Sequence, residues 1–326
     1  RWLNVGLAAG ALLLASGFLW SRPALLSAAA LTLGLSVAIF LLMAGRALSG
    51  VPSTSPTIRG LKLALLGLAG AVGLGAWLAL ALAHGWALPF PVMTDLHAGW
   101  ALGAWAGTLL AAVAYVVVPM FQLTPGYPVR SSWGFPGLML GLVTAWTLAV
   151  LIDQALVIRL VEGLAALAGI SFAGLTLRLQ GQRRRARPDA TSRYWQLGLV
   201  AAILALAMLL AAAAWPPLAE LPGWGLYFGI LLLVGGFMSL IIGMLYKIVP
   251  FLAWMHLRNH VNPGRPVPSM NKLLADTAMH YQMHAHAAAL ALLLAAVAWP
   301  EWLARPAGGA LVLASGWLFH NLLGAA

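Results

Sequence analysis

The chain contains no cysteine among its 326 residues, and only 8% of its residues are charged. The absence of cysteine excludes disulfides, iron–sulfur clusters and thiolate ligands, so any metal would have to be bound by His, Met, Tyr or carboxylate side chains. Soluble domains carry about 25% charged residues, and the low share here excludes that class of protein. Only seven residues are acidic, which argues against proton pumping along a carboxylate-lined channel.

Hydrophobic residues make up 62% of the sequence, and they gather in runs long enough to cross a bilayer. A membrane-spanning helix needs about 20 apolar residues. Ten segments meet this requirement: 2–20, 24–45, 61–83, 95–118, 134–152, 156–178, 194–214, 223–249, 273–298 and 305–325. The sequence therefore predicts an all-α protein, a polytopic integral membrane helix bundle that forms a single transmembrane domain over residues 1–326 in the bacterial inner membrane.

The basic residues predict the orientation of these spans. Every Lys and Arg except Arg22, Arg159 and Arg305 lies at the N-terminus or in the even-numbered loops. Because Lys and Arg concentrate on the cytoplasmic side of membrane proteins, both termini are predicted to be cytoplasmic, and the basic run at 182–187 is the strongest marker. Topology and contact with membrane lipids account for the net charge of +11, and no nucleic-acid partner is expected.

Two of the predicted spans end in similar sequences. Residues 115–121 read Tyr-Val-Val-Val-Pro-Met-Phe, and residues 246–252 read Tyr-Lys-Ile-Val-Pro-Phe-Leu. The motifs are 131 residues apart and predict a parallel repeat that relates the spans near 95–121 and 223–252; chance similarity between apolar helices is the alternative. Each proline is expected to end or kink its helix, which would place His256 and His260 in the following loop.

Three histidines, His280, His284 and His286, fall within one apolar span, and His320 lies in the next. Ionisable groups at this depth are functional candidates, and imidazole binds haem iron, copper and zinc. His280 and His284 share a helix face, so with His320 they are candidate cofactor ligands. The three histidines of the first span form a candidate metal site, although His286 points about 200° away from His284. Helix–helix hydrogen bonding is the alternative role.

A further histidine, His97, lies near the non-cytoplasmic start of its span, two residues after Asp95. It is a candidate haem ligand; the alternative is an interfacial side chain that hydrogen-bonds Asp95. Gly99, Gly103 and Gly107 recur every four residues and clear one face of this helix, as either a flat macrocycle or a neighbouring helix would require.

These motifs resemble a known family. A span that begins at His97 and ends in the motif at 115–121, together with residues 243–251 followed by Trp254 and His256, resembles single-chain relatives of haem–copper oxidase subunit I, a group that includes NnrS-like proteins. The resemblance covers spans four to ten. It implies haem b held by histidines of different spans, with His97 and the pair His280 and His284 as ligand candidates, and copper at a second site.

The sequence also departs from that family. Full oxidase subunits have twelve spans, a His-Pro-Glu-Val-Tyr-type segment and an adjacent His-His pair, and this chain has none of these features. A complete oxygen-reducing centre is therefore not expected.

Three functions remain open from the sequence. The leading one is a haem-binding membrane protein that transfers electrons or binds O2 or NO; if it is an enzyme, it is a haem-dependent membrane oxidoreductase. The second is a transporter or metal permease lined by His and Met. The third is an anchor subunit that binds other respiratory or electron-transfer subunits. No catalytic residue is assigned.

Overall fold

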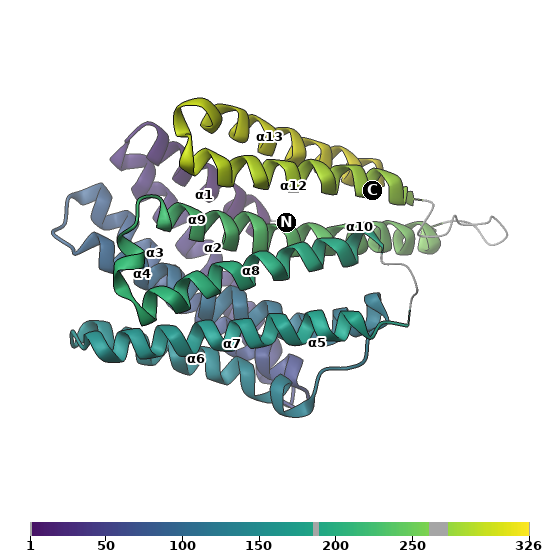
Figure 1. Cartoon of the computed structure of the whole chain (residues 1–326), viewed down its shortest axis with the longest axis horizontal. Coiled ribbons are helices and arrows are strands. Elements are labelled where there is room, and N and C mark those ends of the chain that lie inside the picture. The colour runs from purple at the N-terminus through teal and green to yellow at the C-terminus, as the bar shows by residue number, and fades with distance from the viewer. Residues whose placement is uncertain (1, 185–188, 261–272, 326) are drawn as a thin grey trace. The chain divides into compact units, whose positions relative to one another are not determined.

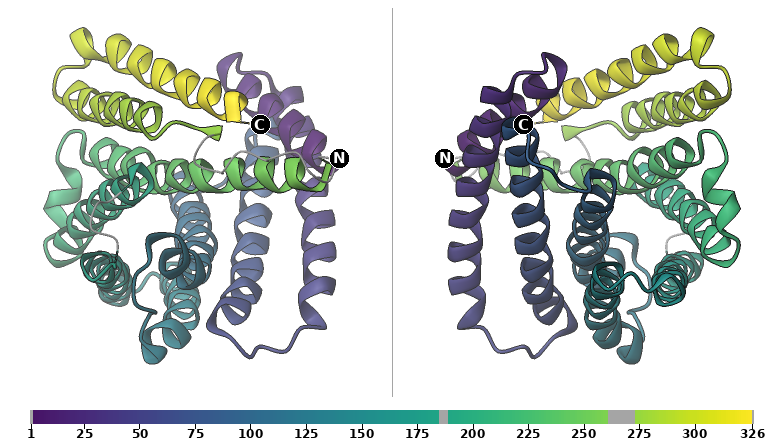
Figure 2. Two further views of the ribbon diagram at one scale, coloured as in Figure 1. Left: turned by 90° about the vertical axis from the view of Figure 1, so that its right-hand side faces the viewer. Right: turned by 90° about the vertical axis from the view of Figure 1, so that its left-hand side faces the viewer.

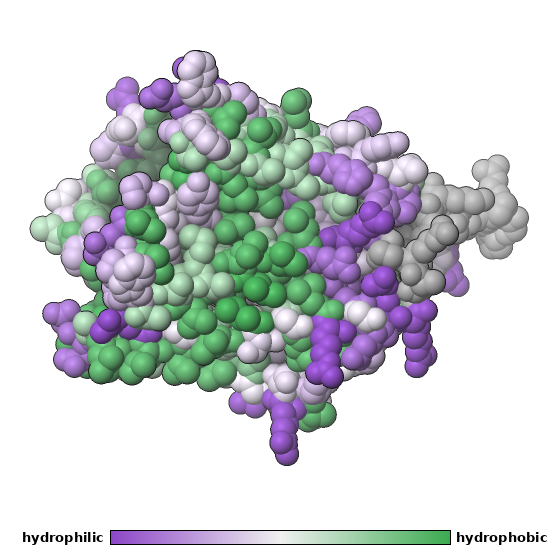
Figure 3. All heavy atoms as spheres, in the orientation of Figure 1, coloured by the Kyte–Doolittle hydropathy of each residue, from purple (hydrophilic) through white to green (hydrophobic). Residues whose placement is uncertain are grey.

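The computed structural model describes residues 2–184, 189–260 and 273–325 (Figure 1). Over this part of the chain the structure is helical without β-strands, and nine helices are long and apolar enough to cross a membrane. A tenth long helix, α13 (Pro300–Ala325), carries Glu301 in its first turn. Apolar side chains cover the helices along their length, and hydrophilic side chains gather toward helix ends (Figure 3). The prediction of an all-α, multi-pass membrane bundle is confirmed.

The chain divides into two compact units, and two of the three boundaries between them in the sequence fall inside helices. Unit 1 comprises residues 1–117 and 126–161, and unit 2 comprises residues 118–125 and 162–326. Unit 1 contains α1 (Trp2–Leu19), α2 (Pro23–Ser49), α3 (Pro56–His84), α4 (Phe90–Gly99), η1 (Trp100–Gly107), most of α5 (Thr108–Gln122) and α6 (Val129–Leu151). Here α3 packs against α2, η1 and α6. The prediction of a single domain is not tested by this division.

Unit 2 is built around α8 and the long helical span that follows it. Its elements are most of α7 (Ala155–Gly181), α8 (Ala190–Ala214), η2 (Pro216–Glu220), α9 (Trp224–Gly229), η3 (Ile230–Met238), α10 (Ser239–His260), α12 (Asp276–Ala298) and α13. The helices α12 and α13 form a hairpin whose arms lie side by side (Figures 1 and 2). Both α8 and α12 pack against η3.

Turn and cap residues set the helix boundaries where the sequence predicts breaks. Ser55 caps α3, because its hydroxyl accepts a hydrogen bond from the Ile58 backbone N–H at 3.2 Å, and Gly85 ends the same helix in the left-handed conformation at φ 66°. Asp189 caps α8 in the same manner, through Ser192 N–H at 2.9 Å. Several basic residues that support the orientation lie outside the described residues: Arg1, Arg185, Arg187, Arg265 and Lys272. The predicted orientation stays a prediction.

The two repeat prolines do not end their helices. Pro119 lies inside α5, which ends at Gln122, and α10 continues from Pro250 to His260. The prediction that His256 and His260 lie in a loop is therefore wrong. A proline removes one backbone hydrogen bond, and further turns can form beyond it when side chains support them. In α10, beyond Pro250, the Arg258 guanidinium lies 5.3 Å from the centre of the Trp254 ring, a cation–π contact between successive turns.

Two spans contain a π-helical stretch, and the two stretches occupy matching places. η1 leads into α5 at Thr108, and η3 leads into α10 at Ser239, 131 residues later. Both hydroxyls are fully buried and bond a carbonyl five residues earlier, Thr108 to Gly103 at 3.3 Å and Ser239 to Val234 at 3.4 Å. A π-helix widens the backbone turn, and these hydroxyls add a hydrogen bond at its end. The same spacing separates the Tyr-and-Pro motifs of the predicted repeat.

A glycine on the preceding helix packs against each π-helical stretch. A Cβ at Gly67 of α3 would clash with the backbone of Ala104 in η1, and a Cβ at Gly198 of α8 would lie 3.0 Å from the Gly236 oxygen in η3. Gly67 and Gly198 are again 131 residues apart. In each unit a glycine of the preceding helix thus packs closely against the π-helical stretch, and the interval of 131 residues between the two glycines is the same as that between Thr108 and Ser239.

Candidate functional site

The side chain of His97 is fixed by the backbone of a neighbouring helix. His97 lies on α4, and its Nδ1 is 2.9 Å from the carbonyl oxygen of Ala71 on α3. A carbonyl only accepts, so Nδ1 carries the proton and Nε2 holds the lone pair. The predicted alternative, a hydrogen bond to Asp95, is not what the structure shows. Nε2 has no hydrogen-bond partner among the described residues.

A glycine on α3 makes this position accessible to the imidazole. Gly75 lies one turn after Ala71, and a Cβ at Gly75 would be 2.8 Å from the Cε1 atom of His97. Real Cβ atoms do not approach a ring atom this closely, so any larger residue would push the ring away from the Ala71 carbonyl. The sequence gives no sign of this requirement, because it arises from the packing of α3 on α4.

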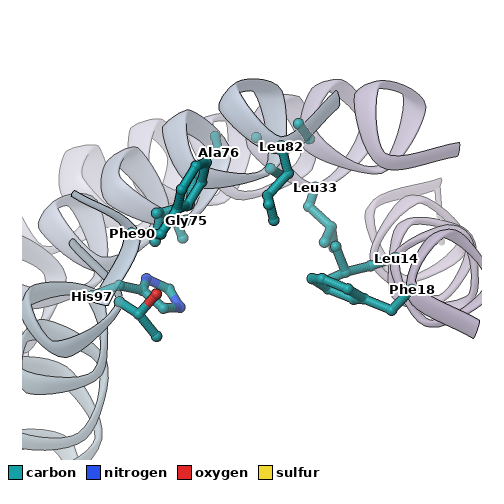
Figure 4. Close-up of a pocket in the computed structure, with 14 residues that line it drawn as sticks. Leu14, Phe18, Leu33, Gly75, Ala76, Leu82, Phe90 and His97 are labelled. Carbon is teal, nitrogen blue, oxygen red and sulfur yellow. The ribbon is translucent and has the colours of Figure 1, made fainter. Parts of the chain in front are cut away.

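His97 forms part of the wall of a cavity of about 410 Å³ within unit 1 (Figure 4). Helices α1, α2, α3 and α4 supply the wall, which is almost entirely apolar: Leu14, Phe18, Ala30, Leu33, Gly34, Val72, Gly75, Ala76, Leu78, Ala79, Leu82, Phe90, Thr94 and His97. Figure 4 shows the imidazole on one side, with Leu14 and Phe18 across the cavity from it. Ligand pockets commonly enclose about 300–1,000 Å³ with a few polar groups in an apolar wall, so this cavity has the size and character of a binding site.

The glycine stripe after His97 serves helix packing. A Cβ at Gly99 would lie 2.5 Å from the Trp146 ring, and one at Gly103 would lie 3.0 Å from Val143, both on α6. Trp100 adds a hydrogen bond from its indole N–H to the Thr147 hydroxyl of the same helix at 3.0 Å. The cleared face thus receives a neighbouring helix, which was one of the two roles that the sequence left open.

The C-terminal histidines do not gather around one buried centre. His284 on α12 and His320 on α13 are exposed, and His280 is half-buried, with Nδ1 2.8 Å from the backbone oxygen of Asp276 in its own helix. Among the described residues, no group of three or more His, Asp or Glu side chains is arranged to hold a metal ion. The roles of these histidines as cofactor or metal ligands stay predictions.

His286 is the buried member of that group. It is 0% exposed, and its Nε2 lies 2.9 Å from the Ser239 hydroxyl at the end of η3. The expectation that His286 points away from the face of His284 is thus met, since one side chain is buried and the other exposed. What sequence reasoning missed is that the buried side of α12 carries His286 rather than the pair at 280 and 284.

Polar side chains from four helices meet His286 in a cluster that we call the polar core: Tyr194, Ser239, Tyr246, Gln282, His286 and Asn321. Gln282 Oε1 accepts hydrogen bonds from the hydroxyls of Tyr194 and of Tyr246, the latter at 3.0 Å. Asn321 donates to the Tyr246 oxygen at 3.0 Å, and Gln282 donates to the Ala314 carbonyl at 3.1 Å. The polar core links α8, α10, α12 and α13. Polar residues one helical turn apart, Gln282 and His286, are the only sequence signal that pointed to it.

An ion pair lies at one end of these helices. Asp189, the cap of α8, is 2.7 Å from Lys247 Nζ on α10, and both side chains are mostly buried. Burial alone would raise the pKa of the Asp189 carboxyl, but hydrogen bonds from Lys247 and Ser192 and the charge of Lys247 outweigh that effect and hold its pKa below the ordinary value.

Replacing Asp189 with asparagine is expected to destabilise the protein at neutral pH by roughly 1–2 kcal/mol, because the cap survives and the ion pair does not. The pKa of Asp189 is lower in the folded than in the unfolded state, so its contribution is present above the unfolded value of about 4 and is lost as the pH falls through the folded value. Thermal unfolding of both proteins in detergent, from neutral to acidic pH, checks this. The control Asp153→Asn changes an exposed carboxyl and should have little effect; a gap between wild type and Asp189→Asn that persists unchanged in acid contradicts the prediction.

Comparison of the chain with known protein families, curated proteins and solved structures finds no match. The site must therefore be interpreted from its own geometry.

Proposed function

We propose that the protein is a haem-binding integral membrane protein in which His97 would hold the iron and the cavity of unit 1 would receive the macrocycle. The observation that carries this proposal is the hydrogen bond between His97 Nδ1 and the Ala71 carbonyl, because it leaves Nε2 free to act as a ligand at the cavity wall. Metal-ligating histidines usually donate their other ring N–H to such an acceptor, which fixes the tautomer and the ring orientation. The resemblance of the chain to relatives of haem–copper oxidase subunit I supports the same assignment.

The residues of the cavity fit such a group. Imidazole nitrogen is a usual protein ligand of haem iron. The small residues Gly75, Ala76 and Ala79 of α3 leave room along the cavity wall, which suits a flat apolar molecule. When bound, haem b would supply redox chemistry or an iron that binds diatomic gases. The contribution of the chain is to hold the ring of His97 in one orientation and to surround the site with apolar side chains that exclude water.

The cavity favours gas binding over electron transfer. Among the described residues that line it, His97 is the only one whose side chain carries a nitrogen or sulfur donor, and Thr94 contributes the one other polar group. Electron-transfer haems usually have two protein ligands, whereas the described wall would supply one, His97, so a haem held here would be able to bind a small gas molecule. We therefore propose binding of O2 or NO. Copper is not part of this proposal.

The proposal places the protein in the bacterial inner membrane, as a distant relative of haem–copper oxidase subunit I. The support is the distribution of Lys and Arg and the two Tyr-and-Pro motifs.

Purified protein from haem-replete cells tests the proposal directly. A pyridine haemochrome assay should give haem b, and reduced-minus-oxidised spectra should show its bands. Carbon monoxide added to the reduced protein should shift the Soret band, as expected for an open axial position. Protein without haem contradicts the proposal, and haem that does not react with carbon monoxide contradicts the assignment of gas binding.

Replacing Gly75 with alanine is expected to lower haem content and shift the Soret band, because the added methyl group would come 2.8 Å from His97 Cε1 and displace the ring. The control is Gly73→Ala on the same helix, where an added Cβ meets nothing within 4 Å. Haem content and absorption spectra of both variants provide the measurement. Equal spectra for the two would show that the ring of His97 does not hold the haem.

A further inference from the structure

Four side-chain atoms of unit 2 are buried without a hydrogen-bond partner among the described residues, one on α7, Gln180 Oε1, and three on α8 and α12: His286 Nδ1, Trp195 Nε1 and Thr191 Oγ1. The three side chains are 0%, 0% and 1% exposed. Buried polar groups in native proteins are nearly always hydrogen-bonded to protein or to ordered water, and the bilayer core offers no bulk water. These atoms therefore require a partner that the described residues do not supply.

The lack of a partner at His286 does not depend on which ring nitrogen carries the proton. Nε2 is paired with the Ser239 hydroxyl at 2.9 Å. If Ser239 donates to the Val234 carbonyl, Nε2 is the donor and Nδ1 is an unpaired acceptor; if Ser239 donates to Nε2, Nδ1 is an unpaired donor. In both cases Nδ1 faces a position where a hydrogen-bonding group is missing.

The three residues that carry these atoms lie against a single turn of α10. Ser239, which contacts His286, and Gly243 lie one turn apart on that helix. A Cβ at Gly243 would be 3.1 Å from Trp195 Cδ1, the ring atom bonded to Nε1, and 3.3 Å from the Thr191 backbone oxygen. The ring of Tyr194, which is next to Trp195 in α8, lies 5.8 Å from the ring of His286. Helices α8 and α12 thus bring the side chains of Trp195 and His286 and the backbone of Thr191 to the same turn.

The helix architecture itself does not require these polar groups, because unit 1 places apolar residues at the matching positions. Matching at 131 residues pairs α3 with α8. For α6 and α12, which are both 23 residues long, we align the first residues, which are 147 positions apart (276 − 129). The counterparts of Thr191, Tyr194, Trp195, Gln282 and His286 are then Gly60, Leu63, Ala64, Phe135 and Met139. A purely structural role would not explain why only unit 2 carries buried polar groups here.

From these observations we propose that unit 2 binds internal water beside the Ser239–Gly243 turn of α10, with His286, Trp195 and Thr191 as its hydrogen-bond partners. A buried water makes about three hydrogen bonds, and the site offers a donor from Trp195, a hydroxyl from Thr191 and the ring nitrogen of His286. Water suits this set because it donates and accepts at once and carries no charge. The proposal does not depend on haem binding in unit 1.

Radiolytic hydroxyl-radical labelling of the full chain in lipid nanodiscs, carried out in 18O-water and analysed by mass spectrometry, tests the site. Radicals formed from a bound water modify the side chains that contact it, even when they are shielded from solvent. Trp195 and His286 should incorporate the label. Met139, the counterpart of His286 in unit 1, is a chemically more reactive side chain that is 7% exposed, and it should remain nearly unlabelled.

The variant Thr191→Val removes one hydrogen-bonding group with little change of shape. Labelling at Trp195 and His286 should be lost, while thermal unfolding shows that the protein stays folded. Labelling that is unchanged in this variant, or labelling of Trp195 and His286 in the wild type no stronger than that of Met139, overturns the proposal. If Thr191→Val does not fold, the comparison with Met139 in the wild type decides alone.

Discussion

Replacing His97 with alanine is expected to reduce the haem content of the purified protein to background. The described wall of the cavity holds one nitrogen donor, so this substitution leaves that wall without a ligand for the iron. The apolar lining can still contact a macrocycle, but contact without ligation does not fix it during purification. The backbone should be little affected, because His97 is only half-buried and its one hydrogen bond is to a carbonyl that already belongs to helix α3.

The measurement is haem per protein by pyridine haemochrome, in variants purified in parallel. His284→Ala is the matched control, because it removes an exposed imidazole from another apolar helix, and it should keep wild-type haem content. Imidazole added together with haem should partly restore the spectrum of His97→Ala by occupying the space of the missing ring. If His97→Ala keeps its haem while His284→Ala loses it, the ligand set lies among the C-terminal histidines and the assignment to unit 1 is wrong.

The sequence predicted the spans well, because the length and polarity of each segment determine whether it can cross a bilayer. It did not predict which side of a span faces the interior. A transmembrane helix is apolar on all sides, so the hydrophobic periodicity that reveals the buried face of a soluble helix is weak. For α12, the spacing correctly placed His286 and His284 on different faces of the helix. It did not show that the face of His286, rather than that of His280 and His284, is buried.

The site around His97 shows a second limit of sequence reasoning. A histidine near the start of an apolar span is visible in the sequence, and it was a candidate for that reason. Its partner, the carbonyl of Ala71, lies 26 residues earlier on another helix. Backbone acceptors carry no signature in the sequence, and the glycine that admits the imidazole differs in no way from the many others in the chain. Only packing identifies Ala71 and Gly75.

The π-helical stretches could not be predicted from the sequence either, yet they add support to the predicted repeat. The sequence matched Tyr115 to Tyr246 and Pro119 to Pro250, a short similarity. The structure adds a π-helical stretch, a buried hydroxyl and a close-packed glycine at the same spacing in each unit. Features of three kinds that recur at one interval support duplication better than a short motif does. If the units share an origin, the His97 site is a departure of one unit, since the counterpart of His97 is Phe228, whereas Ser239 and Tyr246 of the polar core have polar counterparts in Thr108 and Tyr115.

The close packing of Gly67 against η1 is expected to make the stability of the protein sensitive to substitution at this position. Replacing Gly67 with valine should destabilise the protein by about 3 kcal/mol or prevent folding, toward the upper end of what overpacking costs. The atoms that a Cβ would meet are the backbone of Ala104 and Trp105 in η1, and a backbone cannot rotate away as a side chain can. Gly73→Val on the same helix is the control, because that position is exposed and open. Thermal unfolding in detergent and recovery of monodisperse protein measure the difference.

The matching substitution in unit 2 shows whether rigid backbone is the cause. At Gly198 the nearest atom to an added Cβ is Leu240 Cγ at 2.7 Å, part of a flexible side chain, and the Gly236 oxygen is farther away at 3.0 Å. Gly198→Val should therefore cost less than Gly67→Val, because Leu240 can change rotamer. If both variants are as stable as Gly73→Val, close contact between these glycines and the π-helical stretches does not contribute to stability. If Gly198→Val is the more damaging of the two, the rigidity of the η1 backbone is not what makes Gly67 necessary.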